Sequence, residues 1–240
     1  MHGMRLATHA SITLARFDDL TEVGPIGAYV HSETCFLQAG ADVRSASSDP
    51  RSSAAFVHLL LGLHSSEGAA RDAVSRRLAA APWLETARES WSAVLLPFRH
   101  FGEANLLGTA GPVFEVGAST PPEGTPILIM TSAGWDSAEG EALERIIRFS
   151  DNVSAVRIGL GGQPGLLAQH SFGFPGGLAT DGVTITLWQN LASAMAFAYG
   201  PGLHRAQVKV QREELYGDRT SFTRFTLVHS EGAWRAAGAL

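Results

Sequence analysis

The sequence predicts an α+β protein built from two ferredoxin-like repeats. The first observation is composition: hydrophobic residues make up 45% and charged residues 17% of the 240 positions, which is typical of a compact chain with a large core. The second is rhythm, because segments of strand and helix character follow one another in the order strand, helix, strand, strand, helix, strand, and do so twice. Each repeat has one apolar sheet face to bury, so we expect the two sheets to pack as in a dimeric α/β barrel.

The first predicted repeat covers residues 1–119. Ala, Ile and Leu alternate with Thr and Ser in the strand expected over residues 5–17, and a helix is expected to begin at the Asp pair that follows. A Ser-rich stretch then interrupts the pattern. The remaining elements expected in this half are an apolar strand over residues 54–64, a helix capped by Ser65 or Ser66 over residues 65–91, and a short apolar run over residues 93–102.

The second predicted repeat covers residues 120–240, and we expect it to form one integrated domain with the first. It follows a join rich in Gly and Pro. The expected elements are strands over residues 126–135, 155–161, 182–188 and 220–234, and helices over residues 137–153 and 189–200. Residues 159–177 are rich in Gly and Pro and are expected to form a long loop that shapes the mouth of a pocket.

Charge and cysteine content exclude several classes of protein. A net charge of −5 leaves no broad basic surface, so nucleic acid is not an expected partner. The single Cys35 excludes an intrachain disulfide and a cysteine-based metal cluster. No apolar run approaches the roughly 18 residues of a membrane span, and no targeting segment is recognisable, so a cytoplasmic protein is expected. The low content of charged residues also predicts a homo-oligomer.

Common catalytic motifs are missing from the sequence. There is no GxSxG elbow and no Walker loop, and the glycines from Gly159 to Gly165 do not have the dinucleotide-binding spacing. His58 and His64 have no nearby carboxylate that would complete a metal site, which favours a core-edge histidine and a loop histidine. The sequence therefore supports neither a serine hydrolase nor a P-loop enzyme.

One histidine follows a break in a predicted helix. Pro201 ends or kinks the helix near Tyr199, and His204 then begins a charged, apparently helical segment. Val208 would lie on the same face as His204. A neutral imidazole against apolar walls is a suitable axial ligand for heme iron, but the spacing alone leaves a capping role and a core role open as well.

An ordered set of residues in the second half resembles the spheroidene monooxygenase family of carotenoid ketolases. The resemblance extends from about residue 127 to residue 234. The residues that carry it are His204, Arg212-Glu213-Glu214-Leu215-Tyr216, Arg224-Phe225, Glu231-Gly232 and Trp234. It implies a heme b protein similar in architecture to chlorite dismutases and aldoxime dehydratases, with His204 as the proximal ligand of the iron.

The resemblance also gives other residues expected roles. Arg212 or Arg224 would bind a heme propionate, because guanidinium binds carboxylate with two hydrogen bonds, although Arg212 also fits a solvated helix end. His170 would act as an acid or base on the distal face, and a loop histidine without a catalytic role is the alternative. The glutamates after Arg212 are best interpreted as solvated.

The function implied is a heme-dependent monooxygenase of a biosynthetic reaction, with an apolar small-molecule substrate and an electron donor. Dioxygen, peroxide or a substrate heteroatom would bind on the open distal side. One alternative is a heme-dependent dehydratase of the aldoxime type, or another enzyme of N–O chemistry, acting on a nitrogen-containing molecule. A second alternative is an α/β-barrel protein without a cofactor, either a monooxygenase that acts on an activated phenolic substrate or a binding protein for apolar small molecules. A third is a structural or interaction protein that kept the barrel and lost its cofactor.

Overall fold

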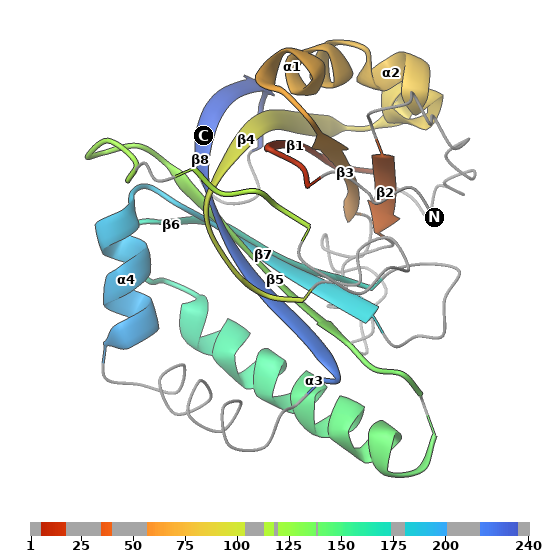
Figure 1. The fold of residues 1–240 in the computed structure, drawn as a ribbon, viewed down its shortest axis with the longest axis vertical. Helices are drawn as coiled ribbons and strands as arrows, with labels where there is room; N and C mark the ends of the chain where they lie inside the picture. The colour runs from red at the N-terminus through yellow and green to blue at the C-terminus, as the bar shows by residue number, and fades with distance from the viewer. Residues whose placement is uncertain are drawn as a thin grey trace.

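The computed structural model describes residues 6–17, 35–39, 57–103, 113–117, 120–137, 139–173, 181–200 and 217–234. These residues form one curled antiparallel sheet with helices on its outside (Figure 1). The strands are β1 (His9–Arg16), β2 (Cys35–Ala39), β3 (Val57–His64), β4 (Glu89–Gly102), β5 (Ile127–Gly134), β6 (Leu166–Gly173), β7 (Asp181–Trp188) and β8 (Arg219–Gly232). The helices are α1 (Glu67–Ser75), α2 (Arg77–Ala80), η2 (Pro82–Thr86), α3 (Gly140–Leu160) and α4 (Leu191–Tyr199).

The strand order is symmetric about the contact between β4 and β8. Across the sheet it reads β2-β3-β1-β4-β8-β5-β7-β6. Within each half, the fourth strand therefore lies beside the first, the first beside the third and the third beside the second. This is the arrangement of a ferredoxin-like repeat, so the α+β fold of two such repeats is confirmed. The boundary between residues 119 and 120 stays a prediction.

The main core lies on the concave side of the sheet, which we call the inner face. Because side chains alternate along a strand, every second residue of β1, β3, β4, β5 and β7 points into this core. Representative members are Ile12, Leu61, Leu95, Met130 and Ile185, all buried in one cluster that joins both halves. The opposite side, the outer face, is covered by α1, α2 and η2 in the first half and by α3 and α4 in the second (Figure 1).

Two register shifts in the pairing of β4 with β8 decide which side chains reach which face. At the first shift, Val228 of β8 has no residue of β4 paired with it. At the second, Phe98 of β4 has no residue of β8 paired with it. An extra residue in one strand turns the following side chains to the other side. Phe225 consequently lies in the inner core, whereas Glu231 lies on the outer face and binds Arg77 beside α1.

Several predicted elements are wrong in detail. The strand expected over residues 155–161 belongs to α3, because Val156 and Leu160 pack against the sheet at helical spacing. The loop expected over residues 159–177 contains β6, and the helix expected over residues 65–91 is divided into α1, α2 and η2, with Pro82 opening the last. Strand β2 was not predicted. The helix expected after residue 17 lies outside the described residues.

Candidate functional site

The outer face of the second half is the candidate site, and we call it the α3–α4 face. It is the surface of β5, β7 and β8 that α3 and α4 cover (Figure 1). Its floor is buried and apolar, with Ile127, Ile129 and Trp188. Around this floor the apolar side chains are only partly buried, and they are Phe98, Val156, Leu166, Leu191, Met195, Phe197 and Phe222. The face therefore has apolar walls that the protein itself covers incompletely.

Arg224 places a cation on this apolar face. Its cross-strand neighbour Ile129 belongs to the floor, so the strand pairing directs Arg224 outward while Phe225 points into the inner core. The guanidinium lies 5.2 Å from the centre of the Phe222 ring, and its Nη2 donates a hydrogen bond of 3.2 Å to the hydroxyl of Tyr199 at the end of α4. The Nε of Arg224 is buried without a hydrogen-bond partner among the described residues. Arg224 thus has a donor directed to no described acceptor.

Helix α3 covers the face loosely. Of its side chains that the structure describes, only Leu160 is buried, and Leu143, Ile147 and Ile158 are exposed. The helix is held near its start by an ion pair of 2.9 Å between Arg145 and Asp218. A hydrogen bond from the backbone N–H of Asp136 lowers the pKa of Asp218, which keeps that carboxylate charged. The described contact of α3 with the sheet is thus made by buried Leu160 and partly buried Val156.

His204 and Arg212 lie outside the described residues. In the sequence, His204 follows Tyr199 by five positions, and Tyr199 is the residue that contacts Arg224. Of the four predicted site residues, the structure therefore describes Arg224 and His170. Tyr199 itself was not among the predicted site residues, because an aromatic residue at a helix end carries no sequence signal of such a contact.

His170 lies in β6 and not in a loop. It is 4% exposed and points to the inner face, where its ring centre is 5.5 Å from Trp234 and 5.9 Å from Phe172. Arg224 points to the outer face. The sheet thus separates these two predicted site residues, and the structure does not bring them into one site. A catalytic role of His170 stays a prediction.

Arg16 belongs to the same inner region as His170. Its guanidinium lies 5.3 Å from the centre of the Trp234 ring and forms an ion pair of 3.3 Å with Glu89. The sequence contained the signal for this placement, because Arg16 continues the alternation of Ile12 and Leu14 by which side chains point inward. Trp234, part of the motif set, is fully buried by these contacts.

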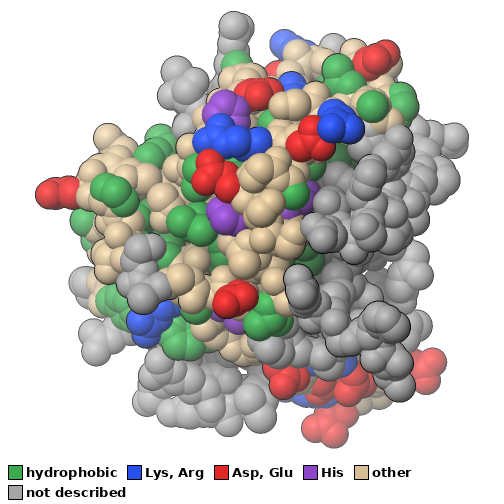
Figure 2. All heavy atoms as spheres, turned by 45° about the horizontal axis from the view of Figure 1, so that its top comes forward, with side chains coloured by type: hydrophobic (Ala, Val, Ile, Leu, Met, Phe, Trp, Pro, Cys, Tyr) green, Lys and Arg blue, Asp and Glu red, His purple; other side chains and the backbone are tan. Residues whose placement is uncertain are grey.

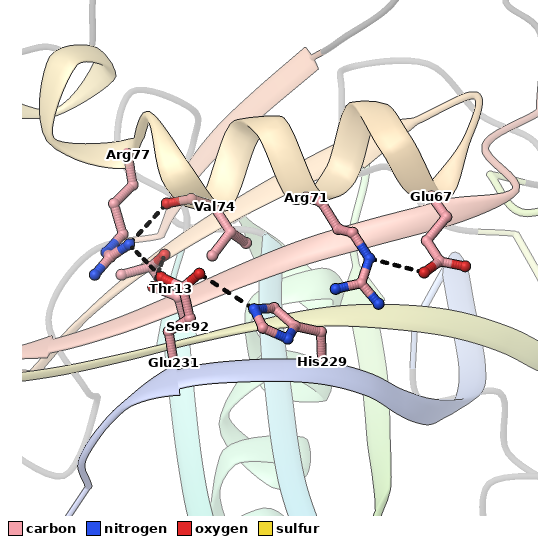
Figure 3. Close-up of polar contacts among 8 residues, drawn as sticks. All are labelled: Thr13, Glu67, Arg71, Val74, Arg77, Ser92, His229 and Glu231. Carbon is pink, nitrogen blue, oxygen red and sulfur yellow. Dashed lines mark hydrogen bonds and ion pairs between the residues drawn. The ribbon is translucent and has the colours of Figure 1, made fainter.

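Glu231, another residue of the motif set, has a structural contact on the outer face of the first half. Its carboxylate accepts a hydrogen bond of 3.1 Å from Arg77 and lies 3.1 Å from Nε2 of His229 (Figure 3). Arg77 also donates to the carbonyl oxygen of Val74 at 2.8 Å. On the face that Figure 2 shows, histidine, basic and acidic side chains lie side by side. Glu231 thus connects the end of β8 to the helices of the first half.

Other histidines of the first half have packing contacts. His58 lies 5.4 Å from Phe17 and 5.9 Å from Trp83, measured between ring centres. His64, expected in a loop, is the last residue of β3 and is buried. Within the described part of the chain, no group of three or more His, Cys, Asp or Glu residues could hold a metal ion. The helices described there include none with the length and apolarity that crossing a membrane requires.

Comparisons with known proteins support the fold. No family model matches the chain, and no curated protein matches it. Among solved structures, an aldoxime dehydratase is similar with a TM-score of 0.54 and 14% identity, over 95% of this chain and 83% of that chain. An aldoxime dehydratase in complex with butyraldoxime has a TM-score of 0.53 and 10% identity, over 91% and 79% of the two chains. A heme-degrading enzyme from Listeria monocytogenes has a TM-score of only 0.33 at 10% identity, over 90% and 98%.

Proposed function

We propose that this protein is a heme-dependent monooxygenase similar to spheroidene monooxygenase, with His204 as the proximal ligand of heme b. The observation that carries the proposal is Arg224, a cation on an apolar face whose Nε has no described partner. Arg224 donates a hydrogen bond to the hydroxyl group of Tyr199, the last residue of α4, and this helix precedes His204 in the sequence. Arg224 and Arg212 are the proposed partners of the heme propionates.

The described residues of the α3–α4 face fit the chemistry of heme. A porphyrin is a flat apolar molecule with two carboxylates, so it needs apolar walls and a cation at one edge. The face offers half-buried Phe98, Met195 and Phe222 as walls, and the guanidinium of Arg224 as a partner for a carboxylate. When bound, heme supplies an iron centre that activates oxygen or binds a heteroatom of the substrate.

The protein's own residues would position the cofactor and exclude water from it. The hydrogen bond between Arg224 and Tyr199 favours one orientation of the guanidinium, which would lower the entropy lost when a carboxylate binds. The loosely packed α3 would provide the cover. An acid–base role of His170 is a further proposal, and because His170 faces inward, it requires the substrate to reach the inner side of the sheet.

A heme-dependent dehydratase of the aldoxime type is the second candidate function. It is favoured by the similarity of the fold to two aldoxime dehydratases with TM-scores above 0.5, one of them in complex with butyraldoxime. The two reactions differ in their need for electrons. Oxygenation with dioxygen requires an external electron donor, whereas conversion of an aldoxime to a nitrile and water is redox-neutral overall.

Titration of the purified protein with hemin tests the cofactor. We expect a sharp Soret band in the natural protein and its loss or strong weakening in His204→Ala, because an imidazole ligand would be missing. Free imidazole should restore part of the band in the His204→Gly variant. His58→Phe is the matched control, since His58 packs among aromatic rings of the first half. An unchanged band in His204→Ala would contradict the ligand assignment.

The two candidate reactions are then separated by substrate. The protein with heme is incubated with butyraldoxime without an electron donor, and with an apolar polyene plus dioxygen and an electron donor. Nitrile formation would support the dehydratase, and a hydroxylated or ketone product would support the monooxygenase. If hemin does not bind at all, the alternative of an α/β-barrel protein that works without a cofactor becomes the better interpretation.

A further inference from the structure

A second group of polar side chains lies on the inner face, on the other side of the sheet from Arg224. We call it the inner polar cluster, and its members are His100 of β4, Ser132 of β5, and Ser221 and Thr223 of β8. The three strands are neighbours in the sheet order β4-β8-β5. The cluster is separate from the α3–α4 face, and nothing in the proposed function uses it.

The strand register places these four residues together. Thr223 pairs with His100 on one side and with Met130, a member of the inner core, on the other. Ser221 pairs with Ser132. Ser221 and Thr223 are two residues apart on β8, so both point inward, about 7 Å from each other along the strand. The residue between them, Phe222, points outward to the α3–α4 face.

The imidazole of His100 is held by one hydrogen bond and has a second nitrogen available. Its Nδ1 lies 2.8 Å from the hydroxyl oxygen of Thr223, whose side chain is fully buried. The ring also makes an edge contact with Phe114 at 5.8 Å between ring centres. Nε2 of His100 is buried and has no hydrogen-bond partner among the described residues. The geometry thus fixes the direction in which this nitrogen can bind another group.

The His100 ring is neutral near pH 7. Burial lowers its pKa from the ordinary value, and a hydrogen bond with the backbone of Gly102 acts in the opposite direction. None of the four members of the cluster is an acid, a lysine or an arginine. A charged ligand would therefore find no opposite charge in this cluster, and its desolvation would be uncompensated.

The serine pair adds a donor. The two hydroxyl oxygens of Ser132 and Ser221 lie 2.6 Å apart and are buried. Each hydroxyl carries one hydrogen, and the bond between them uses only one, so the pair can still donate the other. The cluster therefore presents one imidazole nitrogen and one hydroxyl hydrogen beside apolar rings. A ligand hydroxyl group, which both donates and accepts, can pair with either of these groups.

We propose that the inner polar cluster binds the hydroxyl group of a small neutral phenol, with Nε2 of His100 as its principal partner. The aromatic part of the ligand would contact Phe114, which itself packs edge-to-face against Phe225 at 5.1 Å between ring centres. Thr223 is a positioning residue, because it acts on the ligand through the orientation of the His100 ring. The site is separate from Arg224, the proposed partner of a heme propionate, since it lies on the opposite face of the sheet.

Calorimetric titration with 2-naphthol tests the proposal. We expect the natural protein to bind 2-naphthol at least about tenfold more tightly than naphthalene, because only the former can hydrogen-bond with the cluster. His100→Phe keeps a ring in place but removes Nε2, and it should weaken 2-naphthol binding by about tenfold while leaving naphthalene binding nearly unchanged. Thr223→Val should cause a smaller loss, of a few fold.

Controls separate this site from other effects. His58→Phe removes a histidine that lies among Phe17 and Trp83, and it should bind 2-naphthol as the natural protein does. His100→Phe should keep any Soret band formed with hemin, so the two proposals can fail separately. The phenol proposal is overturned if the natural protein does not bind 2-naphthol, if it binds naphthalene equally well, or if a folded His100→Phe binds 2-naphthol unchanged. The first two comparisons use the natural protein and need no variant to fold.

Discussion

The hydroxyl oxygen of Ser11 lies 2.8 Å from Nε2 of His64, and both side chains are buried on the outer face of the first half. The pair joins β1 to β3 beneath α1, where Val94, the cross-strand neighbour of Ser11, packs against Ala70 and Val74. Gly62 makes room for it. A Cβ atom at position 62 would lie 2.5 Å from the Ser11 oxygen and 2.6 Å from Nε2 of His64.

Gly62→Ala should therefore destabilise the protein. Neither contact can be relieved without breaking the hydrogen bond between Ser11 and His64, so we expect a loss of about 1–3 kcal/mol in the free energy of unfolding. Urea denaturation measures it. Gly68→Ala is the matched control, because its added Cβ would meet nothing closer than 4.0 Å. Equal stability of the two variants would show that the crowding at position 62 is not as the structure has it.

Acid should weaken the fold through His64. Burial, and secondarily the charge of His9, lower the pKa of His64 from 6.5 to about 4. The unfolded chain then binds the proton more strongly than the folded chain, so this contribution to stability is present above pH 6.5 and is lost as the pH falls towards 4. Between pH 6.5 and 5 we expect a loss of about 2 kcal/mol from this residue.

His64→Gln should reduce that pH dependence. A glutamine amide can hydrogen-bond with Ser11 but does not titrate, so its unfolding free energy should change less between pH 7 and pH 5 than that of the natural protein. His9, His58 and His100 also have pKa values lowered by burial and will keep part of the slope. If the unfolding free energy changes equally with pH in His64→Gln and in the natural protein, His64 is not buried in its neutral form.

Arg224→Gln should weaken hemin binding. A hydrogen bond to a charged partner contributes about 1.5–3 kcal/mol, so the loss of the guanidinium should raise the dissociation constant by about tenfold or more. Tyr199→Phe should raise it by a few fold, because Arg224 keeps its charge but loses its 3.2 Å contact. Arg71→Gln is the control, since Arg71 pairs with Glu67 on the exposed side of α1. If Arg71→Gln and Arg224→Gln bind hemin with the same affinity, Arg224 is not a partner of a heme propionate.

Glu231→Gln should cause a small, salt-dependent loss of stability. The hydrogen bond from His229 lowers the pKa of Glu231, and Arg77 acts in the same direction, so the carboxylate contributes stability at neutral pH that falls away in acid. Its side chain is 37% exposed, which limits the effect to about 0.5–1 kcal/mol. The difference in unfolding free energy between Glu231→Gln and the natural protein should be smaller in roughly 1 M NaCl, because salt screens the attraction between the charges. If the loss of stability in Glu231→Gln is the same at high salt, its cause is altered packing and not the loss of the charge.

The sequence predicted the repeats better than their boundaries. Strands β7 and β8 coincide closely with their predicted ranges. The segment around Val156 fits both a strand and a helix by its local pattern, and only its packing against the sheet decides for α3. Strand β6 was mistaken for a loop because glycines flank it on both sides. Its side chains are fixed by pairing with β7, which local sequence does not reveal.

The candidate site was predictable only in part. Arg224 was chosen as a candidate from the motif set, and the direction of its side chain depends on the register of β8 with β5. Tyr199 and His100 were not identified, because their contacts join residues far apart in the chain. The opposite orientations of His170 and Arg224 likewise follow from the curled sheet. A linear sequence gives residue types and spacing, whereas the face on which each side chain lies is a property of the whole sheet.

The position of β8 between β4 and β5 has a consequence for synthesis on the ribosome. β4 has β1 on one side, but its other edge is hydrogen-bonded by β8, the last strand that the structure describes. At about 5–20 residues per second, that edge would wait on the order of ten seconds for its partner. During this interval the nascent chain exposes a long unpaired strand, the kind of edge at which chains aggregate. Chaperone dependence in the cell should therefore depend on how quickly the C-terminal strand arrives.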